Sequence, residues 1–256
     1  MVKVISIANR KGGVGKTTTA VNIATAMAAI GKRVLILDMD PQGNATTSLG
    51  INKKKCLYST YDLMINNCKI EDAIVKTDIK KFDILPSSPS LAAAEIELID
   101  ENKREFVLKN AIDYLNGKYD YVLIDCPPSL NLITVNALVS SDSVIVPLQS
   151  EFLALEGLTD LVKNINAIKK NFNSKLDIQG IVLTMFDKRN NLSQMVEKDV
   201  RKYFGAKVYN TVIPRSVRIS EAPSHGMPVL IYDFKSAGAR AYLNLAKEVL
   251  KREKEI

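Results

Sequence analysis

The sequence contains few of the residues that build disulfide-linked, zinc-binding or histidine-dependent proteins. Only three cysteines occur among 256 residues (Cys56, Cys68 and Cys126), and no two of them have the C-x-x-C spacing. An odd set without paired spacing favours neither a disulfide framework nor a zinc site, so we expect a reducing cytosol. The only histidine, His225, lies in a segment that we interpret as a structural loop, with no role as a catalytic base.

Long hydrophobic runs are also missing. No stretch approaches the ~20 apolar residues of a membrane-spanning helix, and the short apolar run at the N-terminus does not have the form of a signal peptide. Hydrophobic residues make up 46% of the chain and charged residues 25%, a balance typical of globular proteins with an ample core. The net charge of +7 permits a polyanionic partner such as DNA but does not require one.

A glycine-rich segment near the N-terminus has the strongest functional pattern. It follows an apolar run over residues 2–8, which predicts a buried strand, and it precedes a helical pattern over residues 19–30. Glycines let successive backbone N–H groups converge on an anion, and a helix N-terminus adds partial positive charge. We therefore predict a nucleotide-phosphate site made of Lys11, Gly12, Gly13, Val14, Gly15, Lys16, Thr17 and Thr18. Lys16 is expected to reach the β- and γ-phosphates, and the Thr17 hydroxyl to bind Mg²⁺.

This loop departs from the ordinary G-x-x-x-x-G-K-[ST] pattern, because Arg10 stands where the first glycine belongs and Lys11 adds a second lysine. A cation supplied by another chain can stabilise the charge on the γ-phosphate oxygens in the transition state, as arginine fingers do. We therefore hypothesise that two chains enclose two nucleotides face to face, each donating Lys11 to the phosphates of the other. An exposed lysine without function is the plainer alternative.

Strand-like and helix-like segments alternate along the chain. Further strands are expected over residues 33–37, 82–85, 119–125, 143–147, 178–184 and 208–213, and helices over 89–116, 131–140, 155–171, 191–204 and 238–252. Continuous apolar strands separated by helices predict an α/β fold with a mostly parallel, twisted sheet covered by helices on both faces. Because no linker, repeat or low-complexity tract interrupts the pattern, we expect one domain over residues 1–256.

Acidic residues follow two of these strands. Asp38 and Asp40 end the strand over residues 33–37, and Asp125 ends the strand over residues 119–125. Ligands of parallel sheets bind at the carboxyl ends of the strands, so we expect these side chains to meet the glycine loop there. Asp125 and Asp38 are predicted to support Mg²⁺, directly or through water, and Asp40 to position the attacking water. Turn formation at Asp40-Pro41-Gln42-Gly43 is the alternative for the first pair.

Several segments together resemble the ParA/Soj family of chromosome-partitioning ATPases, which belongs to the deviant Walker A superfamily. The similarity covers essentially the whole chain, and its motifs are residues 11–18, 38–46, 119–128, 184–189, 213–218 and 221–226. It implies an ATPase that uses Mg²⁺, forms a homodimer when ATP is bound, and binds double-stranded DNA without sequence preference. It further implies that a ParB/Spo0J-like protein stimulates weak hydrolysis, and that the protein is cytoplasmic and associated with the nucleoid.

The resemblance also assigns roles to individual residues. It implies that Pro214 and Arg215 lie near the adenine, and that Arg189 and Arg218 bind DNA by neutralising phosphates. The last helix supplies weaker DNA-binding candidates: Lys247, Lys251 and Arg252. Because the sequence begins at the first strand, we expect no N-terminal helix-turn-helix arm of the kind that larger plasmid-type relatives use to bind operators.

Three other functions share this kind of nucleotide site. A MinD-like membrane switch needs a terminal amphipathic helix, whereas residues 248–256 carry mixed charge and no aromatic side chain. An iron–sulfur reductase needs two suitable cysteines in each subunit, and Cys126, directly after Asp125, is not at the expected offset. A metabolic ligase or kinase would not explain Arg189 and Arg218.

Overall fold

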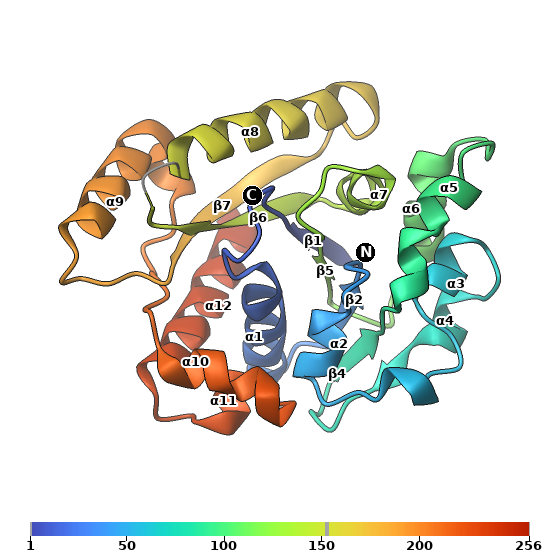
Figure 1. Ribbon diagram of the computed structural model, residues 1–256, viewed down its shortest axis with the longest axis horizontal. Helices are drawn as coiled ribbons and strands as arrows, with labels where there is room; N and C mark the ends of the chain where they lie inside the picture. The colour runs from blue at the N-terminus through green and yellow to red at the C-terminus, as the bar shows by residue number, and fades with distance from the viewer. Residues whose placement is uncertain (1, 152–153, 256) are drawn as a thin grey trace.

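The computed structural model describes residues 2–151 and 154–255, which contain one seven-stranded sheet (Figure 1). Its strands are β1 (Lys3–Ile7), β2 (Val34–Asp38), β3 (Val75–Lys76), β4 (Phe82–Leu85), β5 (Tyr121–Asp125), β6 (Ser143–Gln149) and β7 (Asp177–Thr184). The spatial order is β3-β4-β2-β5-β1-β6-β7, and every neighbouring pair is parallel except β3 with β4. The expected mostly parallel α/β sheet is confirmed.

Helices cover both faces of the sheet, as the unbroken apolar strands predict (Figure 1). One face carries α1 (Lys16–Ala29), α2 (Asn44–Ser48), α10 (Val217–Glu221), α11 (Val229–Tyr232) and α12 (Ala237–Glu255). The other carries α3 (Thr60–Met64), α4 (Ile70–Ala73), α5 (Ala94–Glu97), α6 (Val107–Asp113), α7 (Leu132–Ser140), α8 (Ala154–Asn171) and α9 (Asn191–Phe204). Within β2, Val34 and Ile36 pack on the first face and Leu35 on the second, since strand side chains alternate.

The strand expected over residues 208–213 is wrong. This segment runs beside β7 but makes only isolated bridges, Ile181 with Val208 and Phe186 with Pro214. Tyr209 and Ile213 donate their backbone N–H groups to carbonyls of β7 at 2.9 and 2.8 Å, whereas those of Asn210 and Thr211 donate to Glu248. The apolar content of the segment reflects burial beside β7 without a continuous ladder.

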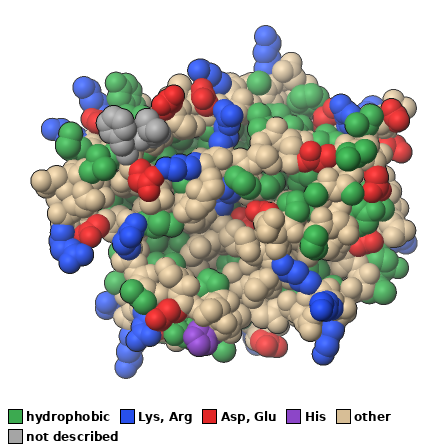
Figure 2. All heavy atoms as spheres, viewed as in Figure 1, with side chains coloured by type: hydrophobic (Ala, Val, Ile, Leu, Met, Phe, Trp, Pro, Cys, Tyr) green, Lys and Arg blue, Asp and Glu red, His purple; other side chains and the backbone are tan. Residues whose placement is uncertain are grey.

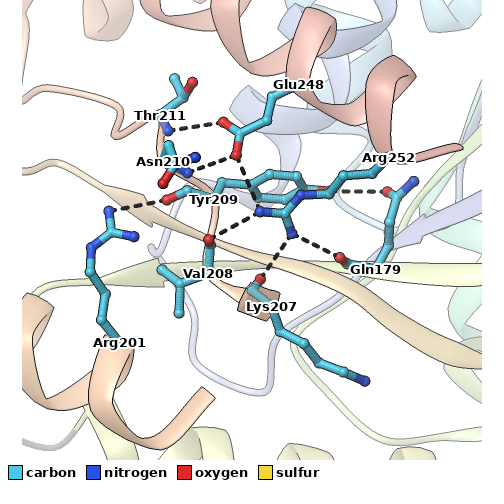
Figure 3. A network of polar contacts seen from close by, with 9 residues as sticks. All are labelled: Gln179, Arg201, Lys207, Val208, Tyr209, Asn210, Thr211, Glu248 and Arg252. Atoms are coloured by element: carbon cyan, nitrogen blue, oxygen red, sulfur yellow. Dashed lines mark hydrogen bonds and ion pairs between the residues drawn. The ribbon is translucent and has the colours of Figure 1, made fainter. Parts of the chain in front are cut away.

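Side chains of α12 bind the backbone groups that a ladder would have used. The Glu248 carboxylate accepts hydrogen bonds from the backbone N–H groups of Asn210 at 2.7 Å and Thr211 at 3.0 Å (Figure 3). The Arg252 guanidinium donates to the backbone carbonyl of Val208 at 3.0 Å and lies 4.1 Å from the centre of the Tyr209 ring. Buried backbone groups need partners of some kind, and here a helix supplies them.

The long helix expected over residues 89–116 is also wrong. The region holds α5, α6 and two 3₁₀ turns, η2 (Pro89–Ala92) and η3 (Arg104–Phe106). The break falls at Asp100-Glu101-Asn102-Lys103, where Lys103 has φ 58°. Asp and Asn side chains compete for backbone hydrogen bonds and weaken a helix, which explains why the apolar periodicity overstated its length.

The other expected long helices are confirmed within a few residues, as α1, α7, α8, α9 and α12. The sequence pattern did not predict the short elements β3, α2, α3, α4, α10 and α11. Within the part of the chain that the structure describes, no helix is both long and apolar enough to cross a membrane.

Candidate nucleotide site

The glycine loop lies between β1 and α1, at the carboxyl edge of the sheet. Gly13 has φ 75° and Gly15 has φ 85°, conformations that favour glycine, and Gly15 is the residue before the first turn of α1. Val14 is buried beneath the loop, and its carbonyl accepts a 2.8 Å hydrogen bond from the Thr184 hydroxyl at the end of β7. The loop is therefore anchored from below, while its glycines and the N-terminus of α1 face an adjoining cavity.

Lys16 lies in this loop with only 7% of its surface exposed. Its Nζ donates to the backbone carbonyl of Lys11 at 3.0 Å, which holds the ammonium group over the loop. Burial lowers the pKa of Lys16, and the nearby carboxyl groups of Asp125 and Asp40 partly oppose that effect. A phosphate group bound in the loop would supply the counter-charge that this cation requires.

The structure confirms that the strands carrying Asp38 and Asp125 end side by side, next to the strand that precedes the glycine loop. β5 lies between β1 and β2, and its last residue, Asp125, is in register with Ile7 of β1 and with Asp38 of β2. Asp40 follows two residues later and lines the cavity beside the loop. Its Oδ1 accepts from the backbone N–H of Gln42 at 2.9 Å, and its Oδ2 has no hydrogen bond to the described residues.

Asp38 is fully buried and is held by α2. Its Oδ2 accepts from the backbone N–H of Thr46 at 2.8 Å and from the Thr46 hydroxyl at 2.6 Å. Burial raises the pKa of Asp38 to about 6, although the Thr46 hydrogen bonds act in the opposite direction. Asp38 therefore stands one layer behind Asp40, where a water molecule could link it to an ion in the cavity.

Asp125 is the group that fits a metal ion best. Both of its carboxylate oxygens are buried and complete no hydrogen bond with the described residues, although the Thr17 hydroxyl lies close enough to lower the pKa. Burial, and then the charge of Asp38, nevertheless raise the pKa of Asp125 well above its usual range. An unpartnered buried carboxylate beside a hydroxyl offers the oxygen ligands that Mg²⁺ prefers. Within residues 2–151 and 154–255, no three His, Cys, Asp or Glu side chains form a metal cluster, so phosphate and water would complete the shell.

Lys11 lies apart from these groups. Its Nζ forms an exposed ion pair with Glu151, and its backbone N–H donates to Asn9 Oδ1 at 3.0 Å. The side chain is half exposed, so it is accessible to a second molecule. Within one chain, Lys11 is therefore not part of the cluster formed by Lys16, Asp40 and Asp125.

Two adjoining cavities extend from the loop. The first, of about 540 Å³, is lined by the loop together with Asp40, Asn44 and Asn131. The second, of about 320 Å³, is lined by Pro214 and Arg215, the residues expected near the adenine. They share Gly15, Thr18 and Met185, an arrangement that suits a phosphate chain in one cavity and a base in the other. No role in the site was predicted for Asn44, Asn131 or Met185, although Met185 directly follows β7 and lies where ligands of parallel sheets bind.

The two arginines expected on DNA are exposed and paired with acids. The Arg189 guanidinium makes two hydrogen bonds with Asp187, at 3.1 and 3.0 Å, and its backbone N–H donates a third at 3.0 Å. These bonds lower the pKa of Asp187 to about 2. Arg218 pairs with Glu221 at 3.1 Å and with Asp233 at 3.4 Å. On the face shown in Figure 2, basic side chains are interspersed with acidic ones and form no continuous block.

Of the weaker candidates on α12, Arg252 has a structural role. Its side chain is only 19% exposed and is engaged by the backbone carbonyls of Gln179 and Val208 (Figure 3). Its assignment to DNA binding is therefore a poor one, because contact with phosphate would require breaking these bonds. Lys247 and Lys251 are exposed on the same helix.

A glycine loop between the first strand and first helix of a parallel sheet, with aspartates from two neighbouring strand ends, defines a P-loop nucleoside triphosphatase. The second lysine in the loop places it in the deviant Walker A group. A family model described as "AAA domain" matches residues 2–178. The chain belongs to the ParA/Soj family of chromosome-partitioning ATPases, as the following relatives show.

The chain is 54% identical to a chromosome partitioning protein ParA from Caulobacter vibrioides, over 99% of this chain and 96% of that protein. It is 52% identical to the sporulation initiation inhibitor protein Soj from Bacillus subtilis, over 97% and 98% of the two chains. Among solved structures, it resembles a cobyrinic acid a,c-diamide synthase from Mycobacterium smegmatis with bound ADP and magnesium, with a TM-score of 0.88, 37% identity and coverage of 99% and 96%. It also resembles the cell division ATPase MinD from Pyrococcus furiosus, with a TM-score of 0.81, 29% identity and coverage of 98% and 99%.

Proposed function

We propose that this protein is an ATP-driven switch that segregates a chromosome or plasmid. ATP binds in the two adjoining cavities of a single P-loop domain, two ATP-bound copies form a homodimer, and the dimer binds double-stranded DNA without sequence preference. A ParB/Spo0J-like protein stimulates weak hydrolysis and release. Such a protein acts in the cytoplasm, on the nucleoid. The observation that carries the proposal is the cluster of Lys16, Asp40 and Asp125 beside the loop, with Lys11 exposed outside it.

The reaction is transfer of the γ-phosphoryl group of ATP to water. Lys16 and the backbone N–H groups of residues 12–16 bind the β- and γ-phosphates, and Lys16 neutralises charge that develops on the oxygens. Thr17 and Asp125, with Asp38 acting through water, would hold Mg²⁺, which would neutralise negative charge on the phosphate groups. The free Oδ2 of Asp40 accepts a hydrogen bond from the attacking water and orients it. The products are ADP and inorganic phosphate.

Lys11 links this chemistry to dimer formation. In the single chain, Lys11 pairs with Glu151. Because the Lys11 side chain is half exposed, it can leave that carboxylate for the more highly charged phosphates of a second subunit. Surface ion pairs of this kind stabilise by only about 0–1 kcal/mol, so exchange for the phosphates of a second subunit is favourable. A cation delivered in this way explains why dimerisation would require ATP.

The DNA-binding surface is supported by the position of Arg189, which lines a groove of about 910 Å³ together with Lys188 and Arg240. Arg218 lies on α10 and is exposed. Contacts to phosphates give affinity without sequence preference and a steep dependence on salt.

Co-sedimentation with duplex DNA tests this function, with ATP, ADP or no nucleotide, across a series of salt concentrations. We expect binding with ATP alone, weakening as salt rises. Arg189→Ala and Arg218→Ala should each reduce the salt slope by about one for every phosphate that the arginine neutralises, whereas Lys163→Ala, an exposed cation on α8, should not. DNA binding that is equally strong with ATP, with ADP and without nucleotide would contradict the proposed switch.

A MinD-like membrane switch is the second candidate, because the chain is 29% identical to a MinD over nearly its whole length. The C-terminal helix argues against it. Glu253 pairs with Lys3 of β1 at 3.3 Å and Arg252 is bound to carbonyls, so this end of α12 is docked on the sheet. Ile256 lies outside the described residues. Co-sedimentation with liposomes distinguishes the DNA-binding switch from the membrane switch, and we expect no binding to liposomes.

A further inference from the structure

A second pair of cavities lies at the amino-terminal edge of the sheet, opposite the nucleotide site. The first, of about 510 Å³, opens where β2, β4 and β5 begin and is lined by Arg33, Lys81 and Tyr119. The second, of about 450 Å³, adjoins the C-terminal end of α1. Both are lined by residues 79–81, so they adjoin each other and form the two halves of a groove. The 14 residues of α1, about 20 Å of helix, separate this groove from the phosphate loop.

The half of the groove next to α1 is apolar. Its floor is formed by the small side chains of Ala28 and Ala29, and its wall by Leu230, Ile231 and Phe234. Ile231 is 54% exposed and Phe234 63% exposed, three residues apart, at and just after α11. Large apolar side chains that gather beside a concave apolar surface mark a binding site more often than scattered ones do.

The other half is basic. It is lined by five cationic side chains and one acidic one, Asp83. Three of the cations already pair with carboxylates, in the pairs Arg33–Asp120, Lys76–Asp83 and Lys118–Glu71. Lys81 donates only to the carbonyl of Gly31, at 3.0 Å, and Lys80 has no partner among the described residues. These two uncompensated cations are the ones that line both halves of the groove.

We propose that this groove binds an acidic peptide segment of a partner protein, with one apolar anchor side chain. The anchor fills the cavity between α1 and α11, and neighbouring carboxylates pair with Lys80 and Lys81. Peptide recognition commonly combines a buried anchor with charged contacts at its rim.

The combination of charge and shape favours a peptide over other anions. A DNA backbone would pair with the lysines but has no side chain for the apolar half. A lipid surface would receive the exposed Ile231 and Phe234 but would leave the cavity beside them unfilled. An acidic segment with a leucine or phenylalanine satisfies both halves at once.

The proposal goes beyond the ATP-driven switch and does not depend on it. None of the lining residues belongs to the phosphate loop or to the aspartate cluster. A partner in this groove could therefore be held in every nucleotide state, and loss of the groove should leave ATP turnover unchanged.

A random library of twelve-residue peptides displayed on phage tests the proposal. The full-length protein is the target, and the double variant Lys80→Glu/Lys81→Glu is used for counter-selection. We expect enriched sequences to carry several Asp or Glu residues around one large apolar residue. Synthetic versions should bind the double variant at least about tenfold more weakly, since two ion pairs become repulsive. Phe234→Ser should weaken the binding of these peptides as well.

Lys54→Glu/Lys55→Glu is the matched control, because it makes the same charge change at two exposed lysines that line neither cavity. Its affinity for the peptides should stay within about twofold of wild type, and both double variants should hydrolyse ATP normally. The proposal is overturned if no acidic sequences are enriched, or if their binding survives the Lys80/Lys81 change. It is also overturned if that change abolishes retention on duplex DNA or on vesicles of anionic lipid.

Discussion

At the scale of residues, the site is built from carboxyl groups that the fold keeps out of water. Asp38 and Asp125 are in register on neighbouring strands and both are fully buried. The charge of Asp38 therefore raises the pKa of Asp125, in addition to the larger effect of burial. Without a bound cation, these two buried carboxyl groups destabilise the folded protein at neutral pH. With a cation bound, they supply strong oxygen ligands for it.

The pH dependence of the free energy of unfolding should reveal the cost of burying these carboxyl groups. The pKa of Asp38 is about 6 in the folded protein, against an ordinary value of 3.8. The folded state thus holds the proton more tightly, and the free energy of unfolding should fall as pH rises from about 4 to about 6. Asp38→Asn removes this effect, so the variant should gain up to roughly 3 kcal/mol over wild type across that interval.

Urea unfolding at pH 4 and pH 7, without nucleotide or Mg²⁺, measures this difference. Asp113→Asn, at an exposed carboxylate on α6, is the control and should track wild type at both pH values. A gap between Asp38→Asn and wild type that stays constant or narrows as pH rises would contradict the account.

Much of this site could be predicted from the sequence alone. Lys16, Asp40 and Asp125 follow from the glycine pattern and from the rule that ligands bind where parallel strands end. Thr46 could not be predicted, because its contact with Asp38 depends on how α2 packs behind β2. The ion pair of Lys11 with Glu151 joins residues 140 positions apart and likewise has no local signal.

At the scale of elements, sequence patterns predicted the long segments and failed where tertiary contacts replace local ones. Residues 208–213 look like a strand because Val208, Tyr209 and Ile213 are apolar and buried. Glu248 and Arg252 of α12 nevertheless bind the backbone groups of this segment. The helical periodicity over residues 89–116 persists across Lys103, although the backbone there adopts a positive φ. A hydrophobic pattern shows which residues are buried, and in these two segments burial does not determine the secondary structure.

Arg252→Ala tests the role of α12 in holding this segment. The change removes donors to the carbonyls of Gln179 and Val208 and a cation from the Tyr209 ring. We expect the free energy of unfolding to fall by about 2 kcal/mol. Lys247→Ala, at an exposed position on the same helix, should change it by less than about 0.5 kcal/mol.

Chemical denaturation of the two variants gives the comparison, and DNA binding of the folded variants gives a second measure. The interpretation predicts that Arg252→Ala binds DNA as wild type does. Equal stabilities, together with a weaker salt dependence of DNA binding for Arg252→Ala, would restore this residue to the DNA-binding surface.

At the scale of the whole molecule, the parallel sheet carries cavities at two opposite edges. Its carboxyl edge carries the nucleotide cavities, and its amino edge carries the groove between α1, α11 and the turn before β4. The first position follows from a general rule of parallel sheets, which the sequence is sufficient to apply. The second depends on residues from distant segments and required the structure.

The proposed switch depends on donation of Lys11 to the phosphates of another subunit, and a mixture of two variants tests that donation. Lys11→Ala keeps Asp40 but cannot donate the lysine, whereas Asp40→Ala keeps the lysine but cannot orient the water. In a mixed dimer, the pocket of the Lys11→Ala subunit contains Asp40 and receives Lys11 from its partner.

ATP turnover of each variant alone should be near background. An equal mixture should rise toward about a quarter of the wild-type rate, because half of randomly formed dimers are mixed and each has one complete site. Turnover of the mixture equal to the average of the two separate variants would contradict donation of Lys11 between subunits.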